Sequence, residues 1–555
     1  MMMTGEIMRE RLTNGLRRGV TVVGGGLATA ALIIGGTAVS SSANAAHATG
    51  HVLLVGSYKG HAGGYSTIQA AVDAAQAGDW ILVAPGVYHE KADLTDTPSE
   101  SLYEQGAFGA VLITKPGIHL RGLNRNSVVV DGTKSSAAKC SSSAGDQQAG
   151  PTVGGRVAGR NGIVVFGADN VSIDNLTVCN FLDGAHGGGN QIWWNGHEGT
   201  STIGIHGYEG SYLNTTTTYF GGDSHAGTYG IFSSDAANGV WSKVYASNMN
   251  DSGAYIGACQ QACNAVIDSS WFEGSALGYS GTNSGGTIII KNNRFNNNAD
   301  GFDSNSQVAG DPPPPQNGAC PNGGTSPITK THSCWVVMNN IFENNNNVNA
   351  PRAGSASEGP PGTGMTIAGG TNDTVMNNIF RGNKAWGLLI VPFPDDGTPP
   401  TPTACANSGG VYAGGSLGCV YDPKNITVKN NTFSNNGTLK NPSNGDIGEL
   451  TLNSHPTNCY IGNKTPDGVF PAGISKVTKC TGTTGGNAFG AGMNLYFHVL
   501  CDTGLGDCPA GAHYPVFTGV KLTPMPPASK LASMPNPCLG VPSNAWCKAG
   551  KLITK

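Results

Sequence analysis

The middle of the chain alternates short apolar, β-branched stretches with polar turns, and the turns repeat one motif. The motif is Asn-Asn-x-Phe, and its clean copies end at Phe295, Phe342, Phe380 and Phe433. A degenerate copy, Ser269-Ser270-Trp271-Phe272, ends 23 residues before Phe295. No helical spacing accompanies these copies. A period in the twenties, made of short strands and turns, predicts a β-solenoid.

The residues of the motif have separate physical roles in such a coil. Asparagine tolerates the left-handed conformation that a sharp corner requires, and stacked asparagines can hydrogen-bond in a ladder. The Phe two residues later should point inward and stack on its neighbours. A low-complexity linker would lack these phased apolar residues. We therefore predict an all-β fold, a single right-handed parallel β-helix over about residues 80–455, with five stacked rings inside: Phe272, Phe295, Phe342, Phe380 and Phe433.

A short helix is predicted at the entrance to the solenoid. Ser66 or Thr67 can cap it, and Gly78-Asp79 ends it before a strand from Trp80 to Ala84. Such a helix would cover the first coil, which otherwise exposes its core and strand edges. Its apolar face comprises Ile68, Ala71, Val72 and Ala75.

This entrance resembles the start of right-handed parallel β-helix proteins of the pectate-lyase-like superfamily. The resemblance rests on Thr67-Ile68-Gln69-Ala70-Ala71-Val72, Gly78-Asp79 and Pro85-Gly86-Val87-Tyr88-His89-Glu90, and the Asn-Asn-x-Phe coils resemble the same group's repeats. It covers about residues 65–455. It implies the fold but selects no activity, because the superfamily holds lyases, hydrolases, esterases, epimerases and non-enzymatic adhesins.

The two ends of the chain differ from the repeats. Residues 1–45 have a basic start, an apolar stretch and the cleavage-site pattern Ala43-Asn44-Ala45, so we predict a signal peptide; an uncleaved anchor is the alternative. Residues 46–480 are assigned to the β-helix domain with its N-terminal cap. Residues 481–555 are rich in Gly, Pro and Cys and are predicted to form an irregular C-terminal cap. The mature protein is expected to be secreted, monomeric and free of the membrane.

Cysteine usage agrees with export. The chain has 14 cysteines, most of them close neighbours in sequence, and in an exported protein disulfides are favoured over zinc. The expected pairs are Cys140–Cys179, Cys259–Cys263, Cys320–Cys334, Cys405–Cys419, Cys459–Cys480, Cys501–Cys508 and Cys538–Cys547.

The charge balance limits the class of partner. The formal net charge is −4, with 31 basic and 35 acidic residues, and no basic patch interleaved with aromatic residues is present. Nucleic acid is therefore not an expected partner. The expected partner is an extracellular polysaccharide. The alternative is that the protein is a non-catalytic spacer or adhesin of the cell surface or matrix.

Aligning the coils on the glycine after each corner predicts which side chains face outward from one sheet. Strand alternation places the second residue after each glycine outside, and a register slip in the irregular coils before Gly253 would exchange the faces. The predicted outer positions are Val164, His206, Phe232, Tyr255, Ser280, Asp303, Thr366 and Leu389, followed two residues on by Phe166, Tyr208, Ser234, Gly257, Thr282 and Asn305. Long insertions between the Phe repeats are expected to project from one side and to wall a groove.

Candidate chemistry gathers on these coils. Residues 181–230 are dense in aromatic, imidazole and carboxylate groups, which suit sugar rings; an ordinary loop packing its own Trp pair is the alternative. His186, His197 and His206 do not have the spacing of zinc ligands. Asp and Asn oxygens could hold Ca²⁺, but no clustered carboxylate motif identifies a site, so no metal ligand is assigned and the cofactor stays open.

Residues 300–305 resemble the Tyr-Gly-Phe-Asp-Pro-His core of the mannuronan epimerases. Gly301, Phe302 and Asp303 match, whereas Asp300, Ser304 and Asn305 replace the Tyr, Pro and His. The presumed acid and base partners of that family are thus missing. The polygalacturonase and pectin methylesterase signatures are absent, and the paired basic residues of a lyase are not evident. Whether the protein is an enzyme stays open at this stage.

The sequence leads to one hypothesis for the site. Asp303 is assigned as the catalytic group, because a carboxylate can transfer protons. His206 lies four coils away in this alignment, about 19 Å at 4.8 Å per coil, so it belongs to another subsite. The predicted substrate-binding residues are His206, Tyr208, Phe232, Tyr255, Trp193 and Trp194.

Overall fold

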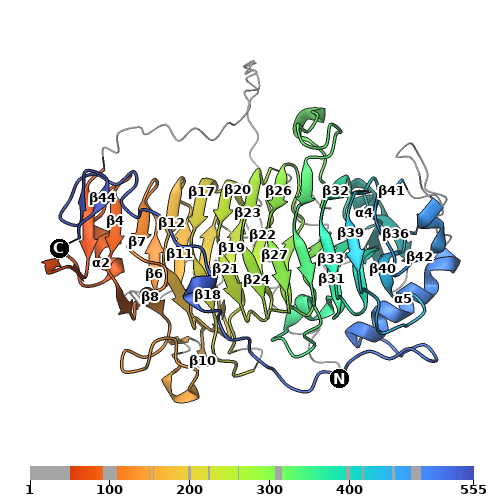
Figure 1. Ribbon diagram of the computed structural model, residues 1–555, viewed down its shortest axis with the longest axis horizontal. Coiled ribbons are helices and arrows are strands. Elements are labelled where there is room, and N and C mark those ends of the chain that lie inside the picture. The colour runs from red at the N-terminus through yellow and green to blue at the C-terminus, as the bar shows by residue number, and fades with distance from the viewer. Residues whose placement is uncertain are drawn as a thin grey trace. The chain divides into compact units, whose positions relative to one another are not determined.

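The computed structural model describes residues 50–91, 109–148, 150–153, 155–197, 202–222, 225–259, 262–306, 316–395, 401–414, 418–452, 457–476 and 489–554. The predicted signal peptide lies outside these residues and stays a prediction. The described residues form one compact unit. Three long parallel sheets run through it, and successive coils add one strand to each sheet (Figure 1). This confirms the predicted parallel β-helix.

The sheets are numbered in the order in which a coil enters them. Sheet 1 contains β1 (Val52–Val55), β4 (Trp80–Val83), β7 (His119–Gly122), β12 (Val171–Asp174), β17 (Ile205–Ser211), β20 (Ala236–Ser242), β23 (Ala265–Asp268), β26 (Ile288–Lys291), β29 (Trp335–Met338), β32 (Asp373–Met376), β38 (Thr427–Lys429) and β41 (Cys459–Ile461). Sheet 2 contains β5 (Gly86–Tyr88), β8 (Val128–Asp131), β13 (Thr177–Cys179), β18 (Asn214–Thr216), β21 (Tyr245–Ser247), β24 (Trp271–Glu273), β27 (Arg294–Asn296), β30 (Ile341–Glu343), β33 (Ile379–Arg381) and β39 (Thr432–Ser434).

Sheet 3 carries the candidate site. It contains β6 (Val111–Ile113), β11 (Ile163–Phe166), β16 (Ile192–Asn195), β19 (Tyr229–Ser234), β22 (Ser252–Gly257), β25 (Leu277–Thr282), β28 (Asp303–Asn305), β31 (Thr363–Ala368), β34 (Trp386–Val391), β40 (Gly445–Glu449) and β42 (Val469–Phe470).

Short elements decorate the coils and their ends. The helices are α2 (Ile68–Ala74), α4 (Pro402–Asn407) and α5 (Phe489–Thr503), with 3-10 turns η1 (Ala144–Asp146), η2 (Pro321–Gly323), η3 (Gly354–Glu358), η5 (Ala472–Lys476) and η6 (Ala528–Lys530). Short strands are β2 (Ser57–Tyr58), β3 (His61–Ala62), β9 (Thr152–Val153), β10 (Arg156–Val157), β14 (Asp183–Gly184), β15 (Gly187–Gly188), β35 (Phe393–Pro394), β36 (Val411–Gly414), β37 (Gly418–Tyr421), β43 (Cys547–Lys548) and β44 (Lys551–Leu552). No helix in the described part of the chain has the length and apolar character needed to cross a membrane.

The Asn-Asn pairs form the corner between sheets 1 and 2. The first Asn of each clean copy is left-handed, with φ of 58, 56, 57 and 54° for Asn292, Asn339, Asn377 and Asn430. The second Asn is buried and donates its side-chain Nδ2 to the Oδ1 of the next coil's Asn. These bonds link Asn293, Asn340, Asn378, Asn431 and Asn463 at 3.0–3.1 Å. Both predicted roles of asparagine are confirmed.

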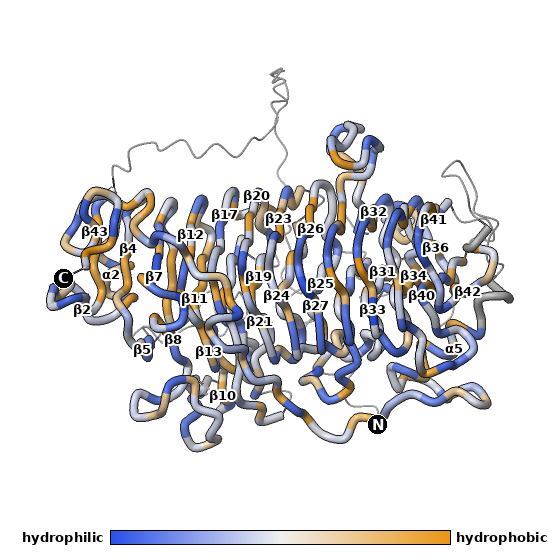
Figure 2. The backbone as a smooth tube through the Cα atoms, in the orientation of Figure 1, coloured by the Kyte–Doolittle hydropathy of each residue, from blue (hydrophilic) through white to orange (hydrophobic). Residues whose placement is uncertain are grey.

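The five predicted phenylalanines stack inside the coils. Their ring centroids lie 4.7–5.3 Å apart from one coil to the next, and every ring is buried. Apolar and polar segments alternate along the coils around this stack (Figure 2). The entrance helix is confirmed too: Thr67 caps α2, and Ile68, Ala71 and Val72 are buried. Glu90 adds a contact that the sequence did not predict, because its carboxylate accepts from the backbone N–H groups of Ile68 and Gln69.

The long insertions do not all leave the coil at one corner, so that prediction was wrong. Residues 306–334 and 392–426 join sheet 3 to sheet 1, whereas residues 344–362 join sheet 2 to sheet 3. From β12 onward the corner between sheets 1 and 2 keeps only two residues and holds no insertion. Insertions therefore flank sheet 3 on both of its edges.

The C-terminal region is more ordered than the predicted irregular cap. Helix α5 packs its Leu495 in one apolar cluster with Trp386 and Leu389 of sheet 3. Residues 513–553 then return as a strap along the coils to the N-terminal end (Figure 1). Asn248 and Thr523 exchange backbone and side-chain hydrogen bonds along this path. The strap ends with buried Trp546 in a cluster with Trp80. The boundary predicted at residue 480 lies outside the described residues.

Six of the predicted disulfides are present: Cys140–Cys179, Cys259–Cys263, Cys320–Cys334, Cys405–Cys419, Cys501–Cys508 and Cys538–Cys547. Cys459 is disulfide-bonded as well, and its predicted partner Cys480 lies outside the described residues.

Candidate functional site

One row of side chains runs along the outer face of sheet 3. The strand register places the following residues opposite one another in consecutive coils: Leu112, Val164, Trp193, Phe232, Tyr255, Ser280, Asp303, Thr366 and Leu389. Of the outer positions predicted from the sequence for this row, all are correct except His206. Trp193 occupies the position that was assigned to His206.

The error comes from one irregular coil. Gly204-Ile205 imitates the glycine-apolar start of a sheet 3 strand, but β17 belongs to sheet 1, and β16 supplies the sheet 3 strand of that coil. His206 is therefore on another face of the solenoid. Its side chain is 61% exposed, and its backbone N–H donates to Asp169. The structure does not bring His206 together with Asp303.

Two further residues predicted to bind sugar lie in the core. Tyr208 points inward from β17 and exchanges a 3.0 Å hydrogen bond with Ser233. Its ring lies 5.6 Å from that of Trp194, which is fully buried. The predictions that Tyr208 and Trp194 face a ligand were wrong, because the misplaced coil exchanged the faces of these strands.

The remaining aromatic residues form a cluster on the outer face, which we call the aromatic cluster: Trp193, Phe232, Tyr229 and Tyr255. Trp193 and Phe232 stack 4.8 Å apart and are only 5% and 4% exposed. Tyr229 and Tyr255 are half-buried and pack on Phe232 at 4.4 and 4.9 Å. The predicted outward positions of Phe232 and Tyr255 are confirmed, whereas Trp193, expected on a loop beside the sheet, lies on strand β16. Trp193 and Phe232 form its floor, and the two tyrosines carry its accessible ring surface.

A second group, the acidic cluster, adjoins the aromatic one. It consists of Asp251, Asp300, Asp303 and Glu358. Asp303 is only 6% exposed, and burial, with the charges of Glu358 and Asp251, raises its pKa to about 7. Burial also raises the pKa of Asp251 to about 7, against the lowering effect of a hydrogen bond from Tyr229. Two carboxyl groups on one face of sheet 3, two coils apart, thus have pKa values near neutral pH.

Asp300 has a different role from its neighbour Asp303. It is fully buried, and its carboxyl group accepts hydrogen bonds from Thr366 Oγ1 at 2.6 Å and from the Phe302 backbone N–H at 3.1 Å. Burial and the charge of Asp303 raise its pKa well above the usual range. A protonated Asp300 therefore keeps Asp303 from facing a second full negative charge.

One hydrogen bond joins the two clusters. The Tyr229 hydroxyl donates to Asp251 Oδ2 at 2.9 Å. Oδ1 of Asp303 is buried without a hydrogen-bond partner, whereas Asp251 has the Ser252 hydroxyl beside it as a second hydrogen-bonding group that lowers its pKa. A buried acceptor without a partner is rare in native structures and calls for a ligand or water.

Two insertions shape the edges of the site. The turn η3 brings Glu358 beside the coils, where Ala356 packs against Ala276 and Leu277. At the next residue, Gly359, a Cβ would lie 2.7 Å from a terminal methyl carbon of Leu277 and 3.4 Å from the Cβ of Asp300, so a larger residue would require the Leu277 side chain to move. Helix α5 contributes Asp502, which interacts electrostatically with Arg352 on the same insertion as Glu358.

The sequence analysis found Asp303 and Tyr255 but missed Tyr229, Asp251 and Glu358. Tyr229 is the first residue of β19 and Asp251 directly precedes β22, so scoring the two residues before Gly230 and Gly253 would have found them. Glu358 stands on an insertion outside the repeat, and no sequence periodicity marks it.

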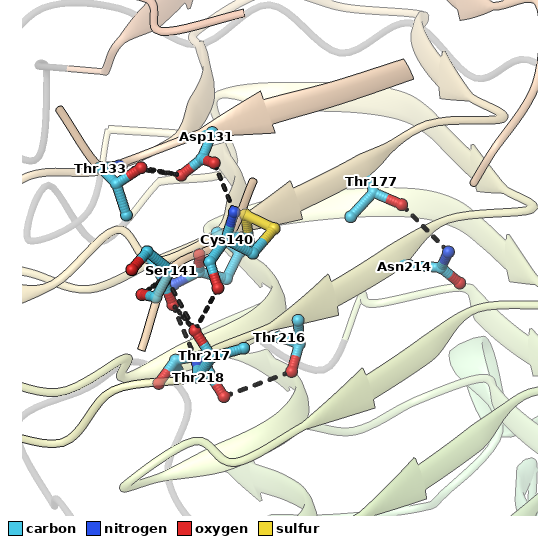
Figure 3. Close-up of a disulfide and its surroundings, with 12 residues drawn as sticks. Asp131, Thr133, Cys140, Ser141, Thr177, Asn214, Thr216, Thr217 and Thr218 are labelled. Atoms are coloured by element: carbon cyan, nitrogen blue, oxygen red, sulfur yellow. Dashed lines mark hydrogen bonds between the residues drawn. A yellow bond between two sulfur atoms is a disulfide. The ribbon is translucent and has the colours of Figure 1, made fainter. Parts of the chain in front are cut away.

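Only one group of described residues has ligand atoms close enough for a metal ion: Asp131, Cys140 and Cys179. The two sulfurs are bonded to each other, and Asp131 accepts hydrogen bonds from Thr133 and from the Cys140 backbone N–H (Figure 3). This group is structural, because it fixes the loop carrying η1 to sheet 2.

No protein-family model and no curated protein sequence matches the chain. Several solved structures match it. A mannuronan C-5 epimerase A-module from Azotobacter vinelandii is 14% identical, with 72% of this chain and 90% of that chain covered and a TM-score of 0.38. A mannuronic acid specific polysaccharide family 6 lyase from human gut microbiota is 13% identical, with coverages of 74% and 80% and a TM-score of 0.39.

A polygalacturonase from Erwinia carotovora ssp. carotovora is 11% identical, with 70% of this chain and 93% of that chain covered and a TM-score of 0.34. The matched structures are pectate-lyase-like β-helix proteins, the group that the sequence resembles. The parallel β-helix of this chain is established by its own strand pairing, and these similarities carry no conclusion about its reaction or substrate.

Proposed function

We propose that the protein is secreted and that the outer face of sheet 3 binds a polysaccharide, with Asp303 transferring a proton during its cleavage or modification. The observation that carries the proposal is the adjacency of the two clusters. Tyrosine rings can stack on sugar rings, and Tyr229 connects them directly to the carboxyl group of Asp251.

The acidic cluster supports proton transfer. A group that exchanges protons works best when its pKa lies near the working pH. Asp303 and Asp251 both have pKa values of about 7, so each is partly protonated in neutral solution. Pairs of carboxyl groups with such shifted pKa values favour a functional site over a structural one.

Disulfides support the extracellular location. Six pairs are formed among the described residues, and disulfides persist in oxidising compartments. A rigid extracellular spacer would share this property but would not require an unpartnered buried carboxylate oxygen.

The test is incubation of the secreted protein with a panel of neutral, acidic and amino polysaccharides, following reducing ends and absorbance of unsaturated products. Asp303→Asn should abolish any turnover found, and Tyr255→Ala should weaken binding. Asp507→Asn and Tyr412→Ala are matched controls, since both residues are exposed and lie outside the two clusters. Wild-type binding and activity in both site variants would refute the proposal and favour the spacer.

A further inference from the structure

The acidic cluster is not neutralised by basic residues. Ion pairs within the described residues involve other carboxylates: Asp79, Asp174, Asp169, Asp268 and Glu343. Arg352 interacts with Asp502. Burying a carboxylate without a cation or sufficient hydrogen bonds is costly, so such a cluster favours a ligand that brings positive charge.

The unpartnered oxygen of Asp303 shows where that charge would bind. Asp303 is 94% buried, because only 6% of its surface is exposed, and its Oδ1 has no hydrogen-bond partner. Asp251 lies on the same face two coils away, and one of its carboxylate oxygens accepts from the Tyr229 hydroxyl. A polymer with ammonium groups on successive units would place positive charge beside both carboxylates.

The shape of the site suits an organic cation. In the described structure, no three carboxylates of the acidic cluster bring their oxygens within 4.8 Å of one another, so they do not surround one point as ligands of a single ion do. Tyr229 and Tyr255 provide ring surfaces beside them, with centroids 5.1 Å apart. Aromatic faces attract both ammonium groups and the apolar faces of sugar rings.

We propose that this site selects a cationic glycan, a polymer of amino sugars with free ammonium groups. The inference rests on the proposed function, because it specifies the substrate of the same site. A polyuronate would add carboxylates to a face that already holds Asp251, Asp303 and Glu358, and like charges at close range are repulsive once these groups are ionised. A neutral glycan would donate hydroxyl hydrogen bonds to Asp303 but would bring no positive charge to offset the ionised carboxylates.

The test compares hexamers of β-1,4-linked glucosamine, N-acetylglucosamine and galacturonate by titration calorimetry, at a pH where the free amines are protonated. The galacturonate titration is run with and without Ca²⁺. We expect the glucosamine hexamer to bind at least about 10-fold more tightly than the others, which corresponds to about 1.4 kcal/mol. Added salt should weaken its binding by screening.

Variants assign the binding to the cluster. Asp303→Asn and Asp251→Asn should each weaken the glucosamine hexamer by about 10-fold or more, whereas Asp507→Asn should not change it. Thermal melting of each variant establishes that it is folded. Equal or tighter binding of the N-acetylated or galacturonate hexamer overturns the charge inference but leaves the proposed function intact. If no hexamer binds, both the inference and the proposed function fail.

Discussion

The asparagine ladder allows a sharp prediction of stability at Asn378. Its side-chain Nδ2 donates to the Val337 carbonyl at 2.9 Å and to Asn431 Oδ1 at 3.1 Å. Its Oδ1 accepts from the backbone N–H of Asn340 at 2.9 Å and from the Nδ2 of Asn340 at 3.1 Å. The residue is 1% exposed, so water does not replace these bonds in the native state.

The substitution Asn378→Ala removes all four hydrogen bonds, but only some of the partner groups are left without another hydrogen bond. Asn340 Nδ2 keeps its bond to Ile290, and Asn431 Oδ1 still accepts from the backbone N–H of Asn378. The Asn340 N–H and the Val337 carbonyl lose their side-chain partner. A buried polar group left unsatisfied costs about 1–3 kcal/mol, so the two together predict a loss of about 2–6 kcal/mol.

The adjacent Asn377 supplies the control. It is exposed and left-handed, with φ of 57°, a conformation that glycine adopts without strain. Asn377→Gly should therefore change the free energy of unfolding by less than about 1 kcal/mol. Urea denaturation followed by circular dichroism measures both variants. If Asn378→Ala costs no more than Asn377→Gly, the ladder is incidental to stability and the reasoning is wrong.

Three other changes test separate parts of the account. Phe342→Ala should cost about 3–5 kcal/mol in urea denaturation and increase hydrogen exchange in the two adjacent coils; exchange confined to its own coil would contradict the stacking. The pKa of Asp303 is raised from 3.8 to about 7, so the stability that its protonated form gives the fold is complete below pH 3.8 and is lost as the pH rises to 7. The free energy of unfolding of Asp303→Asn should therefore rise relative to the wild type by up to about 4 kcal/mol between pH 4 and pH 8. A difference that does not depend on pH would exclude a buried ionisable carboxyl group. Trp546 is buried, and its indole N–H donates to the His61 carbonyl, so Trp546→Ala should make the end of the strap susceptible to limited proteolysis at temperatures below the melting of the coils. If the strap and the coils become susceptible at the same temperature, the strap is not attached separately.

The repeat made the fold predictable, whereas the site was only partly so. Asparagine and phenylalanine recur with the coil, so their corner and their stack follow from local conformation and burial. Asp303 and Tyr255 lie on regular coils and could be placed by counting from Gly301 and Gly253. The site could be found to this extent because strand alternation fixes which side chains face outward.

The failures arise where the repeat is interrupted. An insertion after β16 shifted one coil, so His206 was placed on the wrong sheet. The same shift put Tyr208 on the outside although it is in the core. Glu358 reaches the site from an insertion whose path depends on tertiary packing, including the close approach at Gly359. The strap is likewise set by contacts between residues more than 200 positions apart, which no local pattern encodes.

The most direct test of the central claim is a crystal structure with a bound oligosaccharide from the class that binds best in solution. The account predicts sugar rings against Tyr229 and Tyr255, with a donor group of the glycan within hydrogen-bond distance of Asp303 Oδ1. A glycan bound on sheet 1 beside His206, or on sheet 2, with the outer face of sheet 3 unoccupied, would contradict it.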